Sequence, residues 1–245
     1  MGAWGYGILQ NDDSQDGLAA LIHVIEDEIV RLAAWRRDER STARLGAMIG
    51  LLLQMASWYS FDPEKEVSRT IHSALERHEP LFGVLPRRAR TLLRAVLEGK
   101  GKELTARPGK LNRSVRRALF ATDSDGFPME RVFAKREPSL FEHREAARYV
   151  QEFADHCVSV IDEDFADESI VDDLSRESTG MGAFGTLLVL EPCHVKPSKF
   201  VAWRKRWHTV LAAHDEEFEP DDFEREYNKN VELAFRLALK KFAKK

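Results

Sequence analysis

The sequence predicts an all-α protein that contains at most a short strand or hairpin. Apolar residues recur at steps of three and four along most of the chain, as happens when one face of a helix packs against a core. Helix-start signals precede several of these stretches. In Asp62-Pro63-Glu64, an aspartate serves as the cap, a proline takes the first helical position and an acid follows. At 245 residues, the chain is long enough to bury a substantial core.

The expected helices follow one another through nearly the whole chain. They cover residues 15–37, 41–59, 63–78, 87–98, 111–121, 139–161, 197–211 and 220–241. We expect them to form two helical halves, residues 1–121 and 139–245, that pack together as one unit.

A glycine-rich stretch interrupts this helical pattern in the second half. Gly180-x-Gly182-x-x-Gly185 has the letters of a dinucleotide-binding fingerprint, but that fingerprint requires a strand before it and a helix after it. Here an acidic stretch precedes it, and the apolar residues 186–190 follow. We therefore expect a turn that leads into a short apolar strand or core segment at 186–190, and no bound cofactor.

The composition describes a globular protein rich in surface charge: 43% of the residues are hydrophobic and 32% are charged. The formal net charge of −4 argues against sequence-blind binding of nucleic acid by the whole chain. No apolar run reaches the roughly eighteen residues of a membrane span, and the opening lacks the features of a secretory signal. Two cysteines do not make a disulfide scaffold. We therefore expect a cytoplasmic protein that does not associate with membranes.

The small net charge conceals two charged blocks of opposite sign. Residues 87–117 hold eleven lysines and arginines against two acids, a local charge of +9. Residues 152–177 hold ten acids against Arg176, a local charge of −9. The acidic block is either a solvated face or a surface for a basic protein partner, because concentrated charge steers encounters and selects partners. The residues expected to form this acidic surface are Asp162, Glu163, Asp164, Asp167, Glu168, Asp172 and Asp173.

The basic block is the alternative interface. It would contact nucleic acid, or the acidic block of this chain or of another copy. Proteins that hold single-stranded nucleic acid interleave aromatic side chains among the basic ones, and residues 87–117 contain no aromatic residue. Nucleic-acid binding is therefore the less favoured reading of this block.

The opening of the chain is its most distinctive motif. Gly2, Gly5 and Gly7 alternate with large apolar residues, among them Trp4. Glycines at this density let the backbone approach other groups closely. Asn11, Asp12, Asp13, Ser14 and Asp16 then precede the first apolar helical pattern. We expect Asp12, Asp13 and Ser14 to supply helix-start oxygens and Asp16 to lie in the first turn, where negative charge suits the helix dipole. The motif is either a packed and capped N-terminus or a site in which Asn11, Asp12 or Asp16 binds or catalyses.

This opening resembles the start of a mostly bacterial group of proteins, domain-of-unknown-function family 4259. The residues that carry the resemblance are Gly2, Trp4, Gly5, Gly7, Asn11, Asp12 and Asp16. The resemblance covers about a tenth of the chain, or the first hundred residues if the following helices belong to it. No activity, cofactor or catalytic residue is established for the family, so the resemblance implies none. Proteins of this kind often neighbour toxin or defence genes in bacteria.

Metal and nucleophile sites are poorly supported by the sequence. His156-Cys157 and Cys193-His194 contain zinc-ligand residue types, but neighbouring residues on a helix point in different directions. Cys157 also lies on the apolar stripe of its helix, which suits a small buried residue. We predict no catalytic, cofactor-binding or metal-binding residue from these positions.

The function that we predict is that of a cytosolic, non-catalytic binding protein. It would be immunity- or antitoxin-like and would occlude a basic toxin or enzyme with its acidic surface. Two alternatives stay open. One is a metal-assisted hydrolase that uses Asp12, Asp16 and acids brought near them. The other is a nucleic-acid-binding protein that uses residues 87–117.

Overall fold

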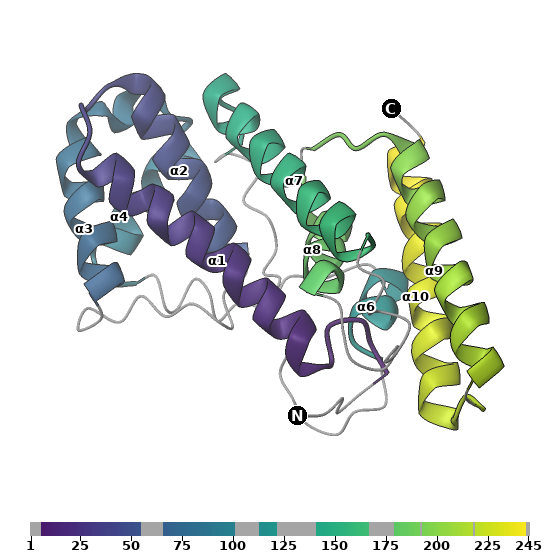
Figure 1. Ribbon diagram of the computed structural model, residues 1–245. Coiled ribbons are helices and arrows are strands. Elements are labelled where there is room, and N and C mark those ends of the chain that lie inside the picture. The colour runs from purple at the N-terminus through teal and green to yellow at the C-terminus, as the bar shows by residue number, and fades with distance from the viewer. Residues whose placement is uncertain are drawn as a thin grey trace. The chain divides into compact units, whose positions relative to one another are not determined.

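The structure is a computed structural model that describes residues 6–54, 66–100, 113–121, 141–166, 179–191, 193–217 and 219–243. These residues form helices and no strand, so the all-α prediction is confirmed (Figure 1). The α-helices are α1 Asp12–Ala33, α2 Glu39–Gln54, α3 Glu66–His78, α4 Arg87–Leu97, α6 Arg113–Leu119, α7 Arg144–Asp164, α8 Thr179–Val189, α9 Pro197–Glu217 and α10 Asp222–Phe242. A 3₁₀ helix, η1, spans Glu79–Val84. In these residues no helix is both long and apolar enough to cross a membrane.

The chain divides into two compact units. Unit 1 contains residues 1–21, 111–127 and 153–245, and unit 2 contains residues 22–110 and 128–152. Both units therefore draw on separated parts of the sequence, and two of the four unit boundaries fall within α1 and α7. The division of the chain into helical halves at residues 1–121 and 139–245 stays a prediction.

Unit 2 is built around α2, α3 and α4. The helices α3 and α4 contact each other, and η1 between them contacts both α3 and α2. Phe82 of η1 is fully buried. The inner face of α4 buries Ala89, Leu92, Leu93 and Val96, as its periodicity predicts. The predicted start signal of α3 at residues 62–64 lies outside the described residues.

Unit 1 is built around an antiparallel pair, α9 and α10, at the C-terminal end (Figure 1). A capping box starts α10: the Asp221 carboxylate accepts the Glu224 N–H at 2.8 Å, and the Glu224 carboxylate accepts the Asp221 N–H at 3.0 Å. α10 also contacts α6 and α8. The aromatic core between these helices contains Phe184, Phe200, Trp203, Phe235 and Phe242.

Of the two expectations for residues 186–190, the strand is wrong, because Thr179–Val189 form the helix α8, whereas a core segment agrees with the burial of Leu187, Leu188 and Leu190. This helix is apolar on every side and is buried on nearly every side, so its sequence lacks the periodicity of a half-buried helix. Its glycines are packing positions. A Cβ at Gly182 would lie 2.4 Å from the Ser14 carbonyl oxygen, and a Cβ at Gly185 would lie 2.9 Å from Leu9.

A lysine from α10 closes the C-terminal end of α8. The Lys241 ammonium donates to the backbone carbonyls of Leu187, Leu188 and Leu190 at 2.8, 3.1 and 2.7 Å. Carbonyls in the last turn of a helix have no partner within the helix, and the helix dipole favours a cation there. Lys241 therefore supplies both the hydrogen bonds and the charge that this helix end requires.

Candidate functional site

The predicted acidic surface begins in the last turn of α7, which holds Asp162, Glu163 and Asp164 and no basic residue. Asp162 is engaged within unit 1. One carboxylate oxygen lies 2.5 Å from the Lys199 ammonium, and the other accepts the Trp203 indole N–H at 2.8 Å. The Asp162 side chain is 41% exposed. Asp162 thus joins α7 to α9, a structural role that the sequence did not indicate.

Asp164 is also turned toward the protein. Gly180, in the first turn of α8, lies so close to this carboxylate that a Cβ there would meet Asp164 Oδ2 at 2.6 Å. The start of a helix is its positive end, so this position favours the Asp164 charge.

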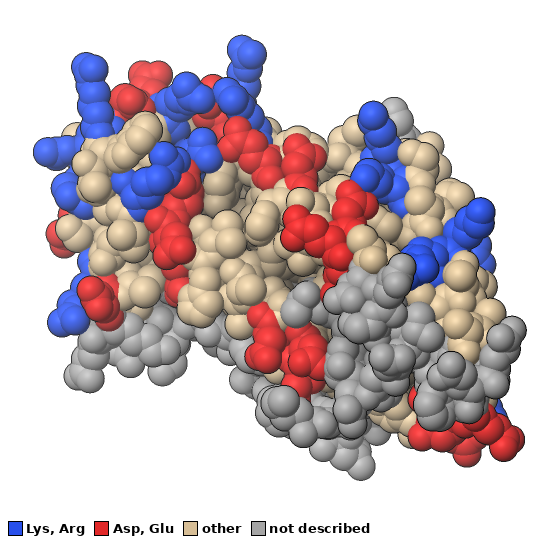
Figure 2. All heavy atoms as spheres, viewed as in Figure 1, with Lys and Arg blue, Asp and Glu red and all other residues tan. Residues whose placement is uncertain are grey.

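Glu163 is exposed, and the Ser159 hydroxyl, one turn earlier, donates to it at 3.2 Å. Among the last-turn acids, Glu163 therefore keeps its charge most open to an outside partner. Acidic side chains lie along α7 in Figure 2, with lysine and arginine side chains over α9. The remaining predicted members of the acidic surface, Asp167, Glu168, Asp172 and Asp173, lie outside the described residues.

The opening motif is built into unit 1 through its backbone. The N–H groups of Ile8 and Leu9 donate to the carbonyls of Ala118 and Leu119 in α6 at 3.1 and 3.2 Å. This contact requires Gly7, because a Cβ there would lie 2.3 Å from the Leu119 carbonyl oxygen. The Gly7 N–H donates to the Gln10 side chain at 2.8 Å. Gly2, Trp4 and Gly5 lie outside the described residues.

The motif continues into the start of α1. Asn11 is the cap, because its side-chain oxygen accepts the Ser14 N–H at 2.7 Å. The cap is thus one residue earlier than Asp12, Asp13 and Ser14, which we expected to supply the helix-start oxygens. Asn11 is 2% exposed.

The two carboxylates of the motif lie on the outer part of this helix start. Asp12 is half-buried in the first turn, and Asp16 is exposed. No group of three or more metal-ligating side chains that could hold an ion occurs among the described residues. The dipole of α1 accounts for the acids in its first turn. The hydrolase alternative gains no support from the arrangement of these residues.

The two cysteines are buried within unit 1 and the histidines beside them are exposed. Cys157 is fully buried, and this burial raises the pKa of its thiol far above the usual range, with the neighbouring Cys193 adding to the effect. The Cys193 thiol donates to the Leu190 carbonyl at 3.2 Å. His156 and His194 face solvent. The Cys157 thiol is therefore inert as a nucleophile.

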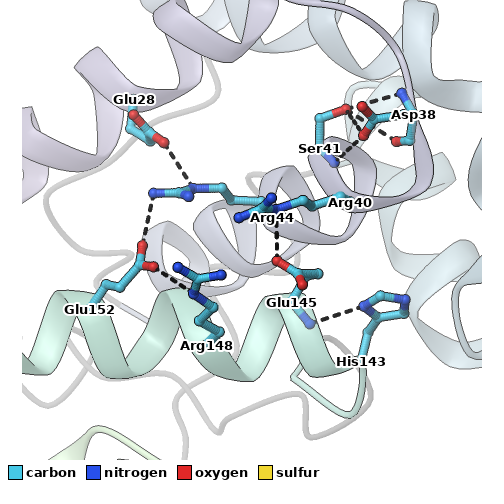
Figure 3. Close-up of polar contacts among 9 residues, drawn as sticks. All are labelled: Glu28, Asp38, Arg40, Ser41, Arg44, His143, Glu145, Arg148 and Glu152. Carbon is cyan, nitrogen blue, oxygen red and sulfur yellow. Dashed lines mark hydrogen bonds and ion pairs between the residues drawn. The ribbon is translucent and has the colours of Figure 1, made fainter.

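In unit 2 the main polar cluster surrounds Arg44 of α2 (Figure 3). Its guanidinium lies 2.8 Å from Glu28 of α1 and 2.9 Å from Glu152 of α7. The same guanidinium lies over the Tyr149 ring, 4.9 Å from the ring centre. Arg148 also pairs with Glu152, at 3.0 Å. Each charge in the cluster has an opposite charge beside it, so the cluster holds three helices together.

The ends of α2 and α7 beside this cluster are capped by side chains. Asp38 caps α2 by accepting the Ser41 N–H at 2.7 Å, and this hydrogen bond lowers the pKa of the Asp38 carboxyl. His143 caps α7 by accepting the Glu145 N–H at its Nδ1 atom at 3.2 Å. Glu145 in turn pairs with Arg40 at 2.9 Å (Figure 3). These contacts fix local structure at the starts of the two helices.

The signal for the Arg44 cluster was present in the sequence. Within the otherwise apolar stretch of residues 42–53, Arg44 is the one charged residue. An arginine in such a helix is expected to find carboxylates, because an unpaired charge is costly to bury. The identity of the partners could not be read from the sequence, because Glu28 and Glu152 are 124 positions apart.

The basic block is divided between the two units. Its helix α4 belongs to unit 2 and its helix α6 to unit 1, and residues 101–112 between them lie outside the described residues. On α4, Arg87 and Arg88 are exposed in the first turn, and Arg94 pairs with Glu79 at 2.9 Å. Within the described residues the basic block is thus represented by two separate helices, one in each unit.

Comparison of this chain with protein-family models, curated proteins and solved structures finds no match to any of them. The resemblance to family 4259 accordingly stays a prediction that rests on the opening residues.

Proposed function

We propose that the protein is a non-catalytic binding protein that recognises a basic protein partner through the acidic surface that begins at the end of α7. One observation carries the proposal: the last turn of α7 contains three carboxylates and no basic residue. A helix C-terminus is the negative end of the helix dipole, and neighbouring like charges repel each other. This helix end is therefore less stable than it would be with neutral residues.

Contacts within the protein offset only part of this destabilisation of the end of α7. Lys199 and Trp203 engage Asp162, and the start of α8 lies against Asp164. Glu163 has the Ser159 hydroxyl but no cation among its described contacts. Four further acids follow in the sequence by Asp173. A surface that is selected for binding would retain acidic residues even where they do not stabilise the fold.

A basic protein is the partner that this charge favours. Opposite charges accelerate encounter and disfavour partners of the wrong sign. We therefore propose an immunity- or antitoxin-like role in a bacterial cytoplasm, in which the acidic surface covers a basic toxin or enzyme. The bacterial, immunity-like role rests on the resemblance of the opening residues to family 4259. The choice of a basic partner rests on the negative charge of the acidic surface.

Capture of partners from a cell lysate tests the proposal. The variant carries Glu163→Lys, Asp167→Lys and Asp172→Lys and leaves Asp162 and Asp164 intact, because these two make internal contacts. The matched control reverses three exposed acids elsewhere: Glu76, Glu142 and Glu219. We expect the wild type and the control to retain a basic protein that the variant loses. Retention of the same proteins by all three chains would contradict the proposal.

A further inference from the structure

The outward face of α1 combines exposed apolar side chains with the polar side chains of His23, Asp27 and Arg31. Among the described residues five large apolar side chains are exposed, and three of them lie within twelve positions of one another. These are Val24 at 40%, Val30 at 46% and Trp35, just beyond the helix end, at 61%. Ala34 is exposed beside them. Apolar side chains gathered in this way mark interaction surfaces, whereas a single exposed one does not.

Trp35 packs against a neighbouring arginine of α1. The Arg31 guanidinium lies over its ring, 4.8 Å from the ring centre. Both oxygens of Glu28 accept hydrogen bonds from Arg31, at Nε and Nη2, at 2.5 Å each. A large aromatic side chain that is already oriented loses little conformational freedom on binding, and tryptophan is enriched among the residues that dominate interfaces.

The charges on this face would complement the same face of a second copy whose α1 runs in the opposite direction. Asp27 and Arg31 are one helical turn apart and are both exposed. Arg31 pairs with Glu28 instead of Asp27, so Asp27 has no ion-pair partner among the described contacts. If a second α1 runs antiparallel to the first, the Asp27 carboxylate of each copy faces the Arg31 guanidinium of the other. The same arrangement sets Val24 against Ala34 and brings the two Val30 side chains together.

We propose that the outward face of α1 (Val24, Asp27, Val30, Arg31, Ala34 and Trp35) is a self-association surface that binds a second copy of this chain across a twofold axis. An interface of this kind uses the same patch on both copies, so the patch must be complementary to itself. Asp27 and Arg31 meet that requirement. The proposal concerns unit 2 and is independent of the acidic surface.

Sedimentation equilibrium of the full chain over a range of concentrations tests the proposal. We expect a reversible dimer whose dissociation constant rises by about thirtyfold in Trp35→Ala, as for a dominant interface residue. Asp27→Arg should weaken the dimer as well. The matched controls are Val201→Ala, which removes an exposed side chain of α9, and Glu76→Arg, and both should leave the constant unchanged. A chain that is monomeric at every concentration, or a dimer indifferent to Trp35→Ala, would overturn the proposal.

A crosslink tests separately whether the two Val30 side chains lie close together, as the antiparallel arrangement requires. Both native cysteines are buried, so a cysteine introduced at Val30 provides an accessible thiol on this face. We expect Val30→Cys to form a disulfide-linked dimer under mild oxidation faster than Val201→Cys does. Equal rates for the two variants would refute the antiparallel arrangement.

Discussion

The side-chain amide of Asn230 donates a hydrogen bond at 2.8 Å to the backbone carbonyl of Tyr6, although the two residues are 224 positions apart. Asn230 belongs to α10 and is 6% exposed. The same amide donates to the Glu226 carbonyl at 3.2 Å. The Tyr6 ring packs on Phe223 with the ring centres 5.3 Å apart. The opening segment is thereby fastened to the last helix of unit 1.

Replacement of Asn230 by leucine should destabilise the protein by about 1–3 kcal/mol, because the Tyr6 carbonyl loses its donor in a site that is largely closed to water. Urea unfolding measures the change in free energy. Asn228→Leu is the matched control on the same helix, since the Asn228 side-chain oxygen has no hydrogen-bond partner. Equal losses in the two variants would show that the contact with Tyr6 adds nothing.

Gly7→Ala should also destabilise the protein, by about 1–3 kcal/mol or more, because the added methyl group would force the opening segment away from α6. The carbonyl that it would meet belongs to the backbone and cannot rotate aside. Gly83→Ala is the control, since a Cβ at Gly83 meets nothing within 4 Å. If Gly7→Ala unfolds at the same temperature as the wild type, the close approach to Leu119 is not a requirement of the fold.

Lys241→Gln should lower the free energy of unfolding by about 1–3 kcal/mol, because a charged donor is removed from a helix end. Hydrogen exchange adds a local readout: amides in the last turn of α8 should exchange faster in the variant, as that turn frays. Lys240→Gln, one position away and exposed, should change neither quantity. Unchanged exchange in α8 would contradict the capping role.

The stability of unit 2 should fall in mild acid because of His78. This side chain is buried and its Nδ1 atom lies 2.6 Å from the Thr42 hydroxyl. Burial lowers the pKa of His78 below its ordinary value of 6.5, and the nearby Arg77 charge lowers it further. The unfolded chain therefore takes up a proton more readily than the folded chain does.

The contribution of His78 is consequently full above its ordinary pKa and is lost as the pH falls through the lowered folded pKa. We expect the free energy of unfolding to decrease as the pH falls below about 6.5, with a smaller decrease in His78→Asn, which retains a donor near Thr42 and does not titrate. Urea unfolding at several pH values gives both slopes. Identical slopes in the two chains would mean that His78 does not govern this range.

The parts of the fold that depend on local sequence were predictable. The Asp221 cap of α10 and the apolar face of α4 follow from neighbouring residues, and both are present. The helix α8 was missed because it is buried on nearly every side, which removes the alternation between apolar and polar residues that distinguishes a helix from a strand.

The candidate site was less predictable, because it depends on contacts between distant residues. The charge of Asp162 suggested a binding role, yet Lys199 and Trp203, about forty positions later, occupy its carboxylate. Gly7 was recognised as a position of close approach, but α6 as its neighbour had no signal in the sequence. The sequence thus indicated where acidic residues concentrate. Only the fold shows which of these acids make internal contacts and which stay exposed.

The central claim is that the acidic surface binds a basic protein. The most direct test is titration calorimetry of the purified chain against the captured basic protein at low and high salt. We expect an affinity that falls as salt is added and that is at least about tenfold weaker in the Glu163→Lys, Asp167→Lys, Asp172→Lys variant. The control with reversed charge at Glu76, Glu142 and Glu219 should bind as the wild type does. An affinity that is independent of salt and equal in the three chains would contradict the account.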